Sequence, residues 1–375
     1  MIRNRSVSTV IATHNRPQLL ARVLDCLARQ KYQPKEVIVV DDGSLPPTKQ
    51  AISDWQAGCK PEFRLIYHRQ PNSGPAVARN VGVALSSGDL IHFIDDDDLM
   101  HAGALGALAS RLNPDEPAIA MASYQNRWED GSVDGLIKPP RLNRDDRLAA
   151  MIGGSWFVPI HGYLFTRAAV DLMGGWSAVL SSQEDDEYLL RAAMAPVSFV
   201  GVPEALVYYC QHSGVRRATP GKPGESVLRG KEERMFADLI IRETVFERLQ
   251  EDGLVSKYRP ALRRWETRFR ERYQAVPGIT QLSSPLLEWL AAKDADTKLP
   301  AWPWPAGRQT AKHHRPVPVP VARVAGQASK KMNRPTLEQH GHPHSHRMGP
   351  SVRPMGAARS TPKNWEHQRK VDFKR

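Results

Sequence analysis

Four consecutive aspartates, Asp95–Asp98, directly follow the apolar run Ile91–Ile94. The apolar run predicts a buried strand, so the four carboxylates would gather where that strand ends. Like charges held this close repel one another and destabilise the fold unless positive charge lies among them. A divalent cation with hard oxygen ligands would supply that charge. The alternative at this point is a solvated acidic loop, which is the usual fate of a charged run.

The residues before this acidic run alternate between strand and helix patterns. A helix is expected to begin at Pro17, because apolar residues follow it at the i, i+3, i+4, i+7 spacing of one buried face. Short loops between alternating strands and helices are typical of a parallel α/β sheet. The expected strands cover residues 7–12, 36–40, 63–68 and 89–94, and a second helix covers residues 76–85.

Polar residues follow three of these expected strands. They are Thr13–Asn15, Asp41–Asp42 and Asp95–Asp98. In a parallel α/β sheet the carboxyl ends of the strands lie along one edge, and ligands bind beyond that edge. Three polar strand ends at one edge therefore favour a ligand site over a solvated surface.

The phosphate-binding signatures of dinucleotide enzymes and P-loop ATPases do not occur in this sequence. The turn after the first strand, Ala12–Arg16, contains no glycine, and neither G-x-G-x-x-G after that strand nor G-x-x-x-x-G-K-[ST] is found. A nicotinamide dehydrogenase, a methyltransferase with a glycine-rich first turn and a P-loop ATPase are thus disfavoured. A site that holds phosphates without such a backbone cradle needs cations. A metal on the aspartates and an arginine such as Arg79 would provide them.

Four segments, in this order, resemble the GT-A glycosyltransferases of family 2. They are residues 10–17, 37–44, 72–82 and 93–98, and the resemblance covers roughly residues 6–215. It implies an α/β fold of the GT-A type, with a mostly parallel sheet flanked by helices. The implied reaction is transfer of a sugar from a nucleotide-diphospho-sugar to an acceptor.

The resemblance also implies roles for individual residues. Asp95 and Asp97 would form the D-x-D motif, with Asp97 as the direct ligand of a manganese or magnesium ion. His212 would contact the metal or the diphosphate, although a single histidine is more often structural. The residues expected to contact the nucleotide part of the donor are Thr13, Asp42, Arg79, Asp95 and Asp96.

A second acidic segment, Glu184–Glu187, resembles the helix start at which this family carries its catalytic base. The resemblance aligns Asp185 with that base. Inverting transfer needs a carboxylate on the face of the sugar opposite the leaving diphosphate, where it takes the proton of the attacking hydroxyl. The structural alternative is favourable charge at a helix N-terminus. The residues expected on the acceptor side are Trp156, His161, Trp176 and Glu184.

The net charge of +12 arises in the C-terminal part of the chain. Residues 301–375 contain 15 Lys and Arg against 3 Asp and Glu, whereas the first 300 residues contain 37 of each sign. We therefore expect no nucleic-acid partner for the core. The C-terminal part is rich in proline and histidine and poor in aliphatic residues, which predicts a disordered tail that could contact an anionic membrane surface.

Two apolar stripes lie between the core and this tail, and they predict a helical extension. The first comprises Met235, Leu239, Phe246 and Leu249, with Phe236 and Ile240 beside it, and the second comprises Leu262, Trp265 and Phe269. The predicted domains are a GT-A domain over residues 1–215, a helical extension over 216–298 and a Pro/His/Arg-rich disordered tail over 299–375.

The cysteines and the hydropathy of the chain predict a cytoplasmic protein. Cys26, Cys59 and Cys210 have no metal or redox spacing, which fits a reducing compartment. No signal peptide precedes the first strand, and no apolar stretch reaches the roughly 20 residues that a membrane span requires.

The sequence as a whole predicts an inverting, metal-dependent glycosyltransferase. A UDP-sugar is the expected donor because the family often uses uridine, and the acceptor is a sugar, lipid-linked or protein hydroxyl. One alternative is a non-catalytic nucleotide-sugar or glycan-binding module, which would not need Asp185 as a base. The other is a nucleotidyltransferase, which normally carries a glycine-rich, basic turn after its first strand.

Overall fold

The computed structural model describes residues 5–46, 48–180, 182–211 and 227–292. They all lie in the first of the two units into which the chain divides, Met1–Lys312. His212 and the predicted tail over residues 299–375 are outside the described residues, and so is the predicted boundary between residues 215 and 216. These three points therefore stay predictions.

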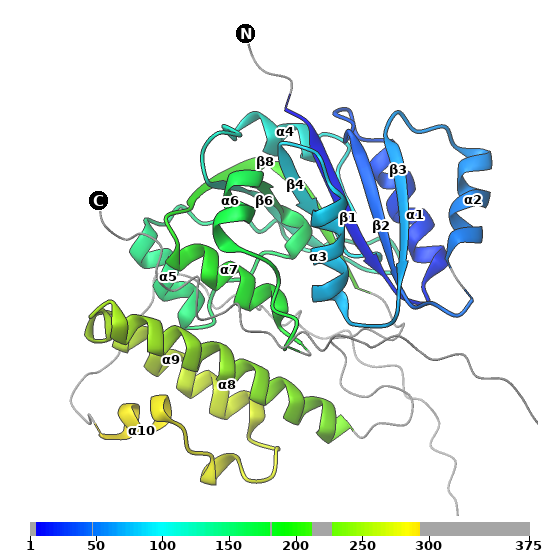
Figure 1. The fold of residues 1–375 in the computed structure, drawn as a ribbon. Helices are drawn as coiled ribbons and strands as arrows, with labels where there is room; N and C mark the ends of the chain where they lie inside the picture. Colours follow the sequence, from blue (N-terminus) through cyan, green and yellow to red (C-terminus); the bar gives the residue numbers. More distant parts are fainter. Residues whose placement is uncertain (1–4, 47, 181, 212–226, 293–375) are drawn as a thin grey trace, which may run out of the picture. The chain divides into compact units, whose positions relative to one another are not determined.

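The described residues form one eight-stranded sheet with helices around it (Figure 1). The order of the strands is β3-β2-β1-β4-β7-β6-β8-β5. The strands are β1 (Val7–Thr13), β2 (Glu36–Asp42), β3 (Arg64–Gln70), β4 (Leu90–Phe93), β5 (Leu99–Met100), β6 (Ala118–Arg127), β7 (Tyr163–Thr166) and β8 (Ser198–Cys210). The helices are α1 (Pro17–Ala28), α2 (Lys49–Gly58), α3 (Pro75–Leu85), α4 (Ala104–Ser110), α5 (Arg144–Ile152), α6 (Arg167–Met173), α7 (Glu184–Met194), α8 (Val227–Glu251), α9 (Val255–Tyr273) and α10 (Pro285–Ala292).

The strands β1, β2, β3 and β4 form the parallel half of the sheet. β1 pairs with β2 and β4, and β2 pairs with β3, all in parallel. Every residue of β2 is buried, because α3 lies in front of β1 and β2 and α1 lies behind them (Figure 1). The approach of α3 is close: a Cβ atom at Gly82 would lie 2.2 Å from Cγ1 of Val10. The expected strands and the two expected helices of this region are confirmed.

The second half of the sheet mixes directions. β7 pairs antiparallel with both β4 and β6, β5 pairs antiparallel with β8, and β6 pairs parallel with β8. Because β5 begins at Leu99, the four aspartates fill the whole turn between β4 and β5. The sheet is thus mostly parallel, as predicted, and its change of direction lies beside the acidic turn.

The helical extension packs against the α/β core. The predicted residues Met235, Leu239, Phe246 and Leu249 of the first stripe and Leu262, Trp265 and Phe269 of the second are all buried. Other residues of α8 and α9 are buried as well, whereas Phe236 and Ile240 are exposed. α9 packs against α5, and Arg268 Nη1 donates to the carbonyl oxygen of Gly153 over 3.2 Å. Among the helices that the structure describes, none is both long enough and apolar enough to cross a membrane.

Candidate active site

The carboxyl ends of β1, β2 and β4 meet at one edge of the sheet, as predicted. The parallel register places Thr13 beside Asp41. Hydrogen bonds then join the three strand ends: the Thr13 hydroxyl donates to Asp96 Oδ2 over 2.7 Å, and His14 Nδ1 lies 2.7 Å from the backbone carbonyl oxygen of Asp42. The polar residues that follow separate strands in the sequence therefore form one cluster.

The four aspartates of the turn alternate between outward and inward positions. The side chains of Asp95 and Asp97 are 40% and 14% exposed, whereas those of Asp96 and Asp98 are 5% and 3% exposed. Alternation of this kind presents the first and third carboxylates to a ligand and leaves the second and fourth to hold the turn. The spacing matches the predicted D-x-D pair.

Arginines from two helices neutralise the first three aspartates. Arg16 Nη1 lies 3.0 Å from Asp96 Oδ1 and 3.0 Å from Asp97 Oδ2, and Arg79 Nη2 donates to Asp95 Oδ1 over 2.7 Å. Burial opposes the charge of Asp95, but Arg79 outweighs it and lowers the pKa of that carboxyl. Burial raises the pKa of Asp96 to about 7 although Arg16 opposes the shift. Asp96 and its partner Thr13 are buried, and their predicted contact with a nucleotide stays a prediction.

His161 supports the fourth aspartate from the interior. Its Nδ1 lies 3.0 Å from Asp98 Oδ2, and Asp98 Oδ1 accepts a hydrogen bond from the backbone N–H of Cys210 over 2.8 Å. Burial disfavours the imidazolium, but Asp98 outweighs burial and raises the pKa of His161. His161 is fully buried and supports Asp98, which anchors the acidic turn to β8 through Cys210. The expected place of His161 on the acceptor side stays a prediction.

Asp42 is engaged by the loop between β3 and α3. Its carboxylate accepts hydrogen bonds from Gln70 Nε2 over 2.8 Å and from the backbone N–H groups of Ser73 and Gly74 over 2.7 and 2.9 Å. These bonds fix the start of α3, the helix that carries Arg79. The predicted contact of Asp42 with a nucleotide base stays a prediction, because the structure contains no nucleotide.

Arg79 links the acidic turn to the start of α7. Besides Asp95, it donates to Glu184 Oε1 over 3.2 Å, and its guanidinium lies 4.5 Å from the centre of the Trp176 ring. Trp176 is 3% exposed and stacks on Tyr188, with ring centres 4.2 Å apart. The ring is thus a buried platform under Arg79, and the expected acceptor-side role of Trp176 stays a prediction.

Trp156 and Glu184, the other two residues expected on the acceptor side, are also engaged with the protein. Trp156 is half-buried, and its Nε1 donates to the Tyr163 hydroxyl over 2.8 Å. Glu184 is buried against Arg79. Both side chains therefore support the site, and their contact with an acceptor stays a prediction.

The first turn of α7 holds four consecutive carboxylates, and only one of them has no cationic partner among the described residues. That one is Asp185, which is partly exposed. Burial, with the neighbouring charges of Glu184 and Asp186, raises the pKa of Asp185 to about 7. The other three carboxylates each pair with an arginine, in the pairs Glu184–Arg79, Asp186–Arg242 and Glu187–Arg191.

The residue before this turn has an unusual backbone. Gln183 lies in the left-handed region, with φ 60° and ψ 24°, and its side chain does not cap α7. This conformation costs a non-glycine residue about 1–2 kcal/mol, so surrounding contacts must hold it. Such strain clusters at functional sites.

Sequence reasoning missed two arginines of this site. Arg16 stands inside the segment 10–17 that carries the resemblance, so a cation opening α1 was available as a signal. Arg242 lies 56 residues beyond Asp186 on another helix, and no local pattern marks it.

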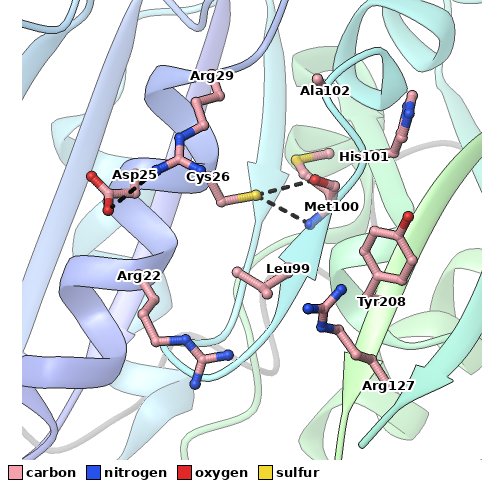
Figure 2. A pocket seen from close by; sticks show the side chains of 10 residues that line it. All are labelled: Arg22, Asp25, Cys26, Arg29, Leu99, Met100, His101, Ala102, Arg127 and Tyr208. Carbon is pink, nitrogen blue, oxygen red and sulfur yellow. Dashed lines mark hydrogen bonds and ion pairs between the residues drawn. The ribbon is translucent and has the colours of Figure 1, made fainter. Parts of the chain in front are cut away.

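A groove of about 470 Å³ lies on another side of the acidic turn, between α1 and β5 (Figure 2). Cys26 on α1 hydrogen-bonds through Sγ to the backbone N–H and carbonyl of Met100, and so joins the two elements. The residues that line the groove are Arg22, Asp25, Cys26, Arg29, Leu99, Met100, His101, Ala102, Arg127 and Tyr208. None of them is a residue of the acidic cluster or of α7, so the groove is separate from the candidate active site.

The fold and the acidic strand ends define a nucleotide-sugar transferase architecture of the GT-A type. A solved structure of Staphylococcus aureus TarS, residues 1–349, in complex with UDP-GlcNAc is similar, with a TM-score of 0.51 and 17% identity over 76% of this chain and 77% of that one. Residues 8–171 match the model of glycosyl transferase family 2, so this part of the chain belongs to that family. The predictions of the family and of the GT-A fold are confirmed.

Curated relatives support the same family. A GalNAc(5)-diNAcBac-PP-undecaprenol beta-1,3-glucosyltransferase of Campylobacter jejuni is 29% identical over 157 residues, which are 40% of this chain and 50% of the relative. The uncharacterized glycosyltransferase YwdF of Bacillus subtilis is 28% identical over 190 residues, 50% of this chain and 68% of the relative. An uncharacterized glycosyltransferase of Rickettsia bellii is 33% identical over 131 residues, but this chain covers only 18% of it. The chain thus spans only half of the Campylobacter relative and 18% of the Rickettsia relative.

Proposed function

We propose that this protein transfers a glycosyl group, with inversion, from a nucleotide-diphospho-sugar to an acceptor hydroxyl. One observation carries the proposal: Arg79 binds both the D-x-D carboxylate Asp95 and Glu184, the neighbour of Asp185, which has no ion pair among the described residues. The donor side and the candidate base are thereby held on two elements that face one another across a single guanidinium. A binding module would have no use for an unpaired carboxylate in this place.

The donor is proposed to be a UDP-sugar. The TarS structure was solved in complex with UDP-GlcNAc, which supports a nucleotide-sugar for this family. The donor-side residues are Asp42, Arg79 and Asp95, with Thr13 and Asp96 below them. For the acceptor, the name of the Campylobacter relative favours a lipid-linked saccharide over a free sugar or a protein. Peripheral membrane contact and a cytoplasmic location remain predictions.

The residues of the acidic turn fit a divalent cation. Asp95 and Asp97 offer hard carboxylate oxygens two residues apart and both reach the surface of the turn. Among the described residues no group of three or more His, Cys, Asp or Glu side chains could hold a metal alone. Mg²⁺ is usually bound by one or two carboxylates, and substrate phosphates and water complete its coordination. A manganese or magnesium ion on the acidic turn would be held in the same way. Bound there, with His212 as a proposed further ligand, the ion would stabilise negative charge on the leaving diphosphate.

Asp185 is the proposed general base. Its carboxylate would accept the proton of the acceptor hydroxyl while that oxygen attacks the sugar. The three arginine pairs engage the neighbouring carboxylates, which leaves Asp185 as the carboxylate of this turn without an ion pair among the described residues. A base with a pKa near the operating pH combines a useful ionised fraction with sufficient basicity.

A thermal-shift panel tests the donor assignment. UDP with manganese is expected to raise the melting temperature more than either alone, because the ion is proposed to bind together with the diphosphate. A ligand at 100 times its Kd stabilises the folded state by about 2.7 kcal/mol. GDP and ADP with manganese test the base, and UMP tests the need for the β-phosphate. Equal shifts with UMP and UDP, or no shift with any nucleoside diphosphate, would contradict the proposal.

The pH dependence of transfer tests the base. Because Asp185 must be ionised, kcat/KM is expected to rise from pH 5.5 and level off above the pKa of about 7. Asp186→Asn removes a neighbouring negative charge that raises this pKa, so its profile should shift to lower pH. A profile that is flat from pH 5.5 to 8, or that shifts upward in Asp186→Asn, would exclude Asp185 as the titrating base.

A further inference from the structure

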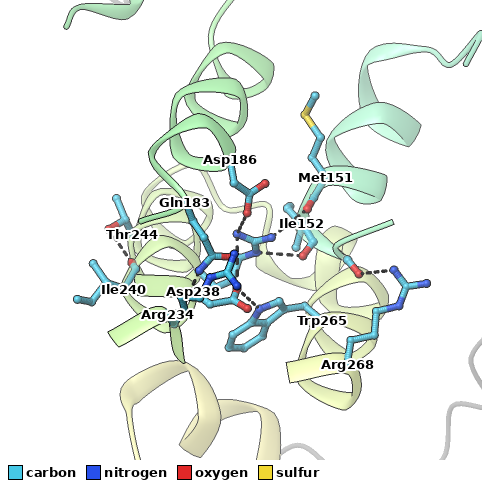
Figure 3. A network of polar contacts seen from close by, with 12 residues as sticks. Met151, Ile152, Gln183, Asp186, Arg234, Asp238, Ile240, Thr244, Trp265 and Arg268 are labelled. Atoms are coloured by element: carbon cyan, nitrogen blue, oxygen red, sulfur yellow. Dashed lines mark hydrogen bonds and ion pairs between the residues drawn. The ribbon is translucent and has the colours of Figure 1, made fainter. Parts of the chain in front are cut away.

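The first turn of α7 is fastened to the helical extension by contacts on both sides of Asp185. Gln183 Nε2 donates to the carbonyl oxygen of Arg234, and Asp186 Oδ2 accepts from Arg242 Nη1 over 2.7 Å. Figure 3 shows Gln183 and Asp186 at the start of α7, close to Asp238 of α8 and Trp265 of α9. The two contacted residues flank the candidate base.

We propose that Arg242 is a positioning residue for Asp185, and that α8 is therefore a working part of the active site. The inference rests on the proposed function, in which Asp185 is the base. It assigns to the extension a role that the family model, which matches only residues 8–171, does not cover.

Arg242 is held in one place from three directions. It is 2% exposed, and besides Asp186 it donates to the carbonyl oxygens of Ile152 and Met151 over 3.2 and 3.3 Å. Its guanidinium thus ties α7 to the end of α5. A planar guanidinium that makes several directed hydrogen bonds fixes geometry better than a point charge does. Asp186 is consequently held at a set distance from α8.

A second carboxylate, which is buried, lies near the same guanidinium nitrogen of Arg242. Asp238, one turn earlier on α8, lies 3.9 Å from Arg242 Nη1. Asp238 in turn accepts a hydrogen bond from Trp265 Nε1 over 2.9 Å and lies 3.6 Å from Arg272 Nη1. The chain of contacts therefore runs from α9 through Asp238 and Arg242 to α7.

The strained backbone of Gln183 explains why the contacts between α7 and α8 matter for Asp185. A left-handed residue directly before Glu184 sets the direction in which α7 begins, and so sets where Asp185 points. The side chain that could cap the helix binds Arg234 of α8 instead. Without α8, the turn could relax to an unstrained conformation, and a shift of about 1 Å in a reacting group can cost about 10²-fold in rate.

The experiment compares Arg242→Met, Arg242→Lys and the double variant Asp186→Asn/Arg242→Met in the full chain. Arg242→Met is expected to lower kcat about 10- to 100-fold with the KM for the donor within threefold, since the arginine touches no substrate. Arg242→Lys, which keeps the charge but loses the planar guanidinium, should recover only part of kcat. The double variant removes the carboxylate that Arg242→Met leaves without its arginine and should be more active than Arg242→Met. Arg248→Met, at a 47% exposed site on the same helix, is the matched control and should behave as wild type.

Kinetics and exchange separate this inference from the proposed function. Hydrogen–deuterium exchange over residues 184–190 needs no activity, and faster exchange in Arg242→Met than in Arg248→Met is expected. If α7 loosens but wild-type protein transfers no sugar, the proposed function fails and the positioning role stands. A folded Arg242→Met with kcat within twofold of wild type, or with unchanged exchange, overturns the inference. A double variant that is no more active than Arg242→Met also overturns the inference. The activity of the double variant decides the case as well if Arg242→Met does not fold.

Discussion

Asp185→Asn is expected to lower kcat about 10²- to 10⁴-fold while the KM for the donor changes little. The amide keeps the size of the carboxylate and most of its hydrogen bonding, but it cannot accept the proton of the acceptor hydroxyl, and general base catalysis contributes rate factors of this order. The protein should fold normally, since Asp185 has no ion pair to lose among the described residues. Steady-state transfer measured against both donor and acceptor concentration checks the expectation.

Glu187→Gln is the matched control for this change. Glu187 lies in the same turn of α7 and pairs with Arg191 inside that helix, so removing its charge perturbs the helix but not the proposed proton transfer. It should keep kcat within a few-fold of wild type. Full activity of Asp185→Asn would place the base elsewhere, with Glu184 and Asp186 as the next candidates. Glu184 is the weaker of these two because Arg79 holds it buried.

The parallel half of the sheet could be predicted because its signals are local. An apolar run such as residues 36–40 and a helical spacing after Pro17 each need only a few neighbouring residues to be recognised. Three of the four expected strands end too early, however. β2 continues through Asp42 because the parallel ladder pairs Asp41 with Arg69 and Asp42 with Gln70, and this pairing outweighs the polarity of the residues.

The antiparallel strand β7 could not be predicted in the same way. Tyr163–Thr166 has only four residues, and its pairing with β4 joins positions more than 70 residues apart. Two of the side chains expected on the acceptor side, His161 and Trp176, are buried near this strand. Their burial depends on that long-range pairing and on the platform that α7 supplies through Tyr188.

The candidate site was predictable in its carboxylates and in Arg79, but not in its other two arginines. Strand ends and a helix start place Asp95, Asp97 and Asp185 by local rules. Arg16, which precedes α1, and Arg242 of α8 also decide which carboxylates are engaged, and only the folded chain brings them there. Among the described residues, the carboxylate of α7 that has no ion pair is consequently a result of the tertiary structure.

Asp97→Ala is expected to abolish manganese-dependent binding of nucleoside diphosphate and to lower transfer by on the order of 10³-fold or more, because compensation of the diphosphate charge is worth several kcal/mol. The fold should survive. Asp97 repels Asp96, whose pKa it helps to raise, and Arg16 keeps its bond to Asp96 when Asp97 is removed. The measurements are the melting temperature, the UDP-induced shift with and without manganese, and the transfer rate. As the control, Asp54→Ala removes an exposed carboxylate on α2, bonded only to Gln50 among the described residues, and should leave all three unchanged. Wild-type transfer that persists at full rate in excess chelator would show that Asp97 holds no catalytic metal, and its carboxylate would then have to act through Arg16 alone.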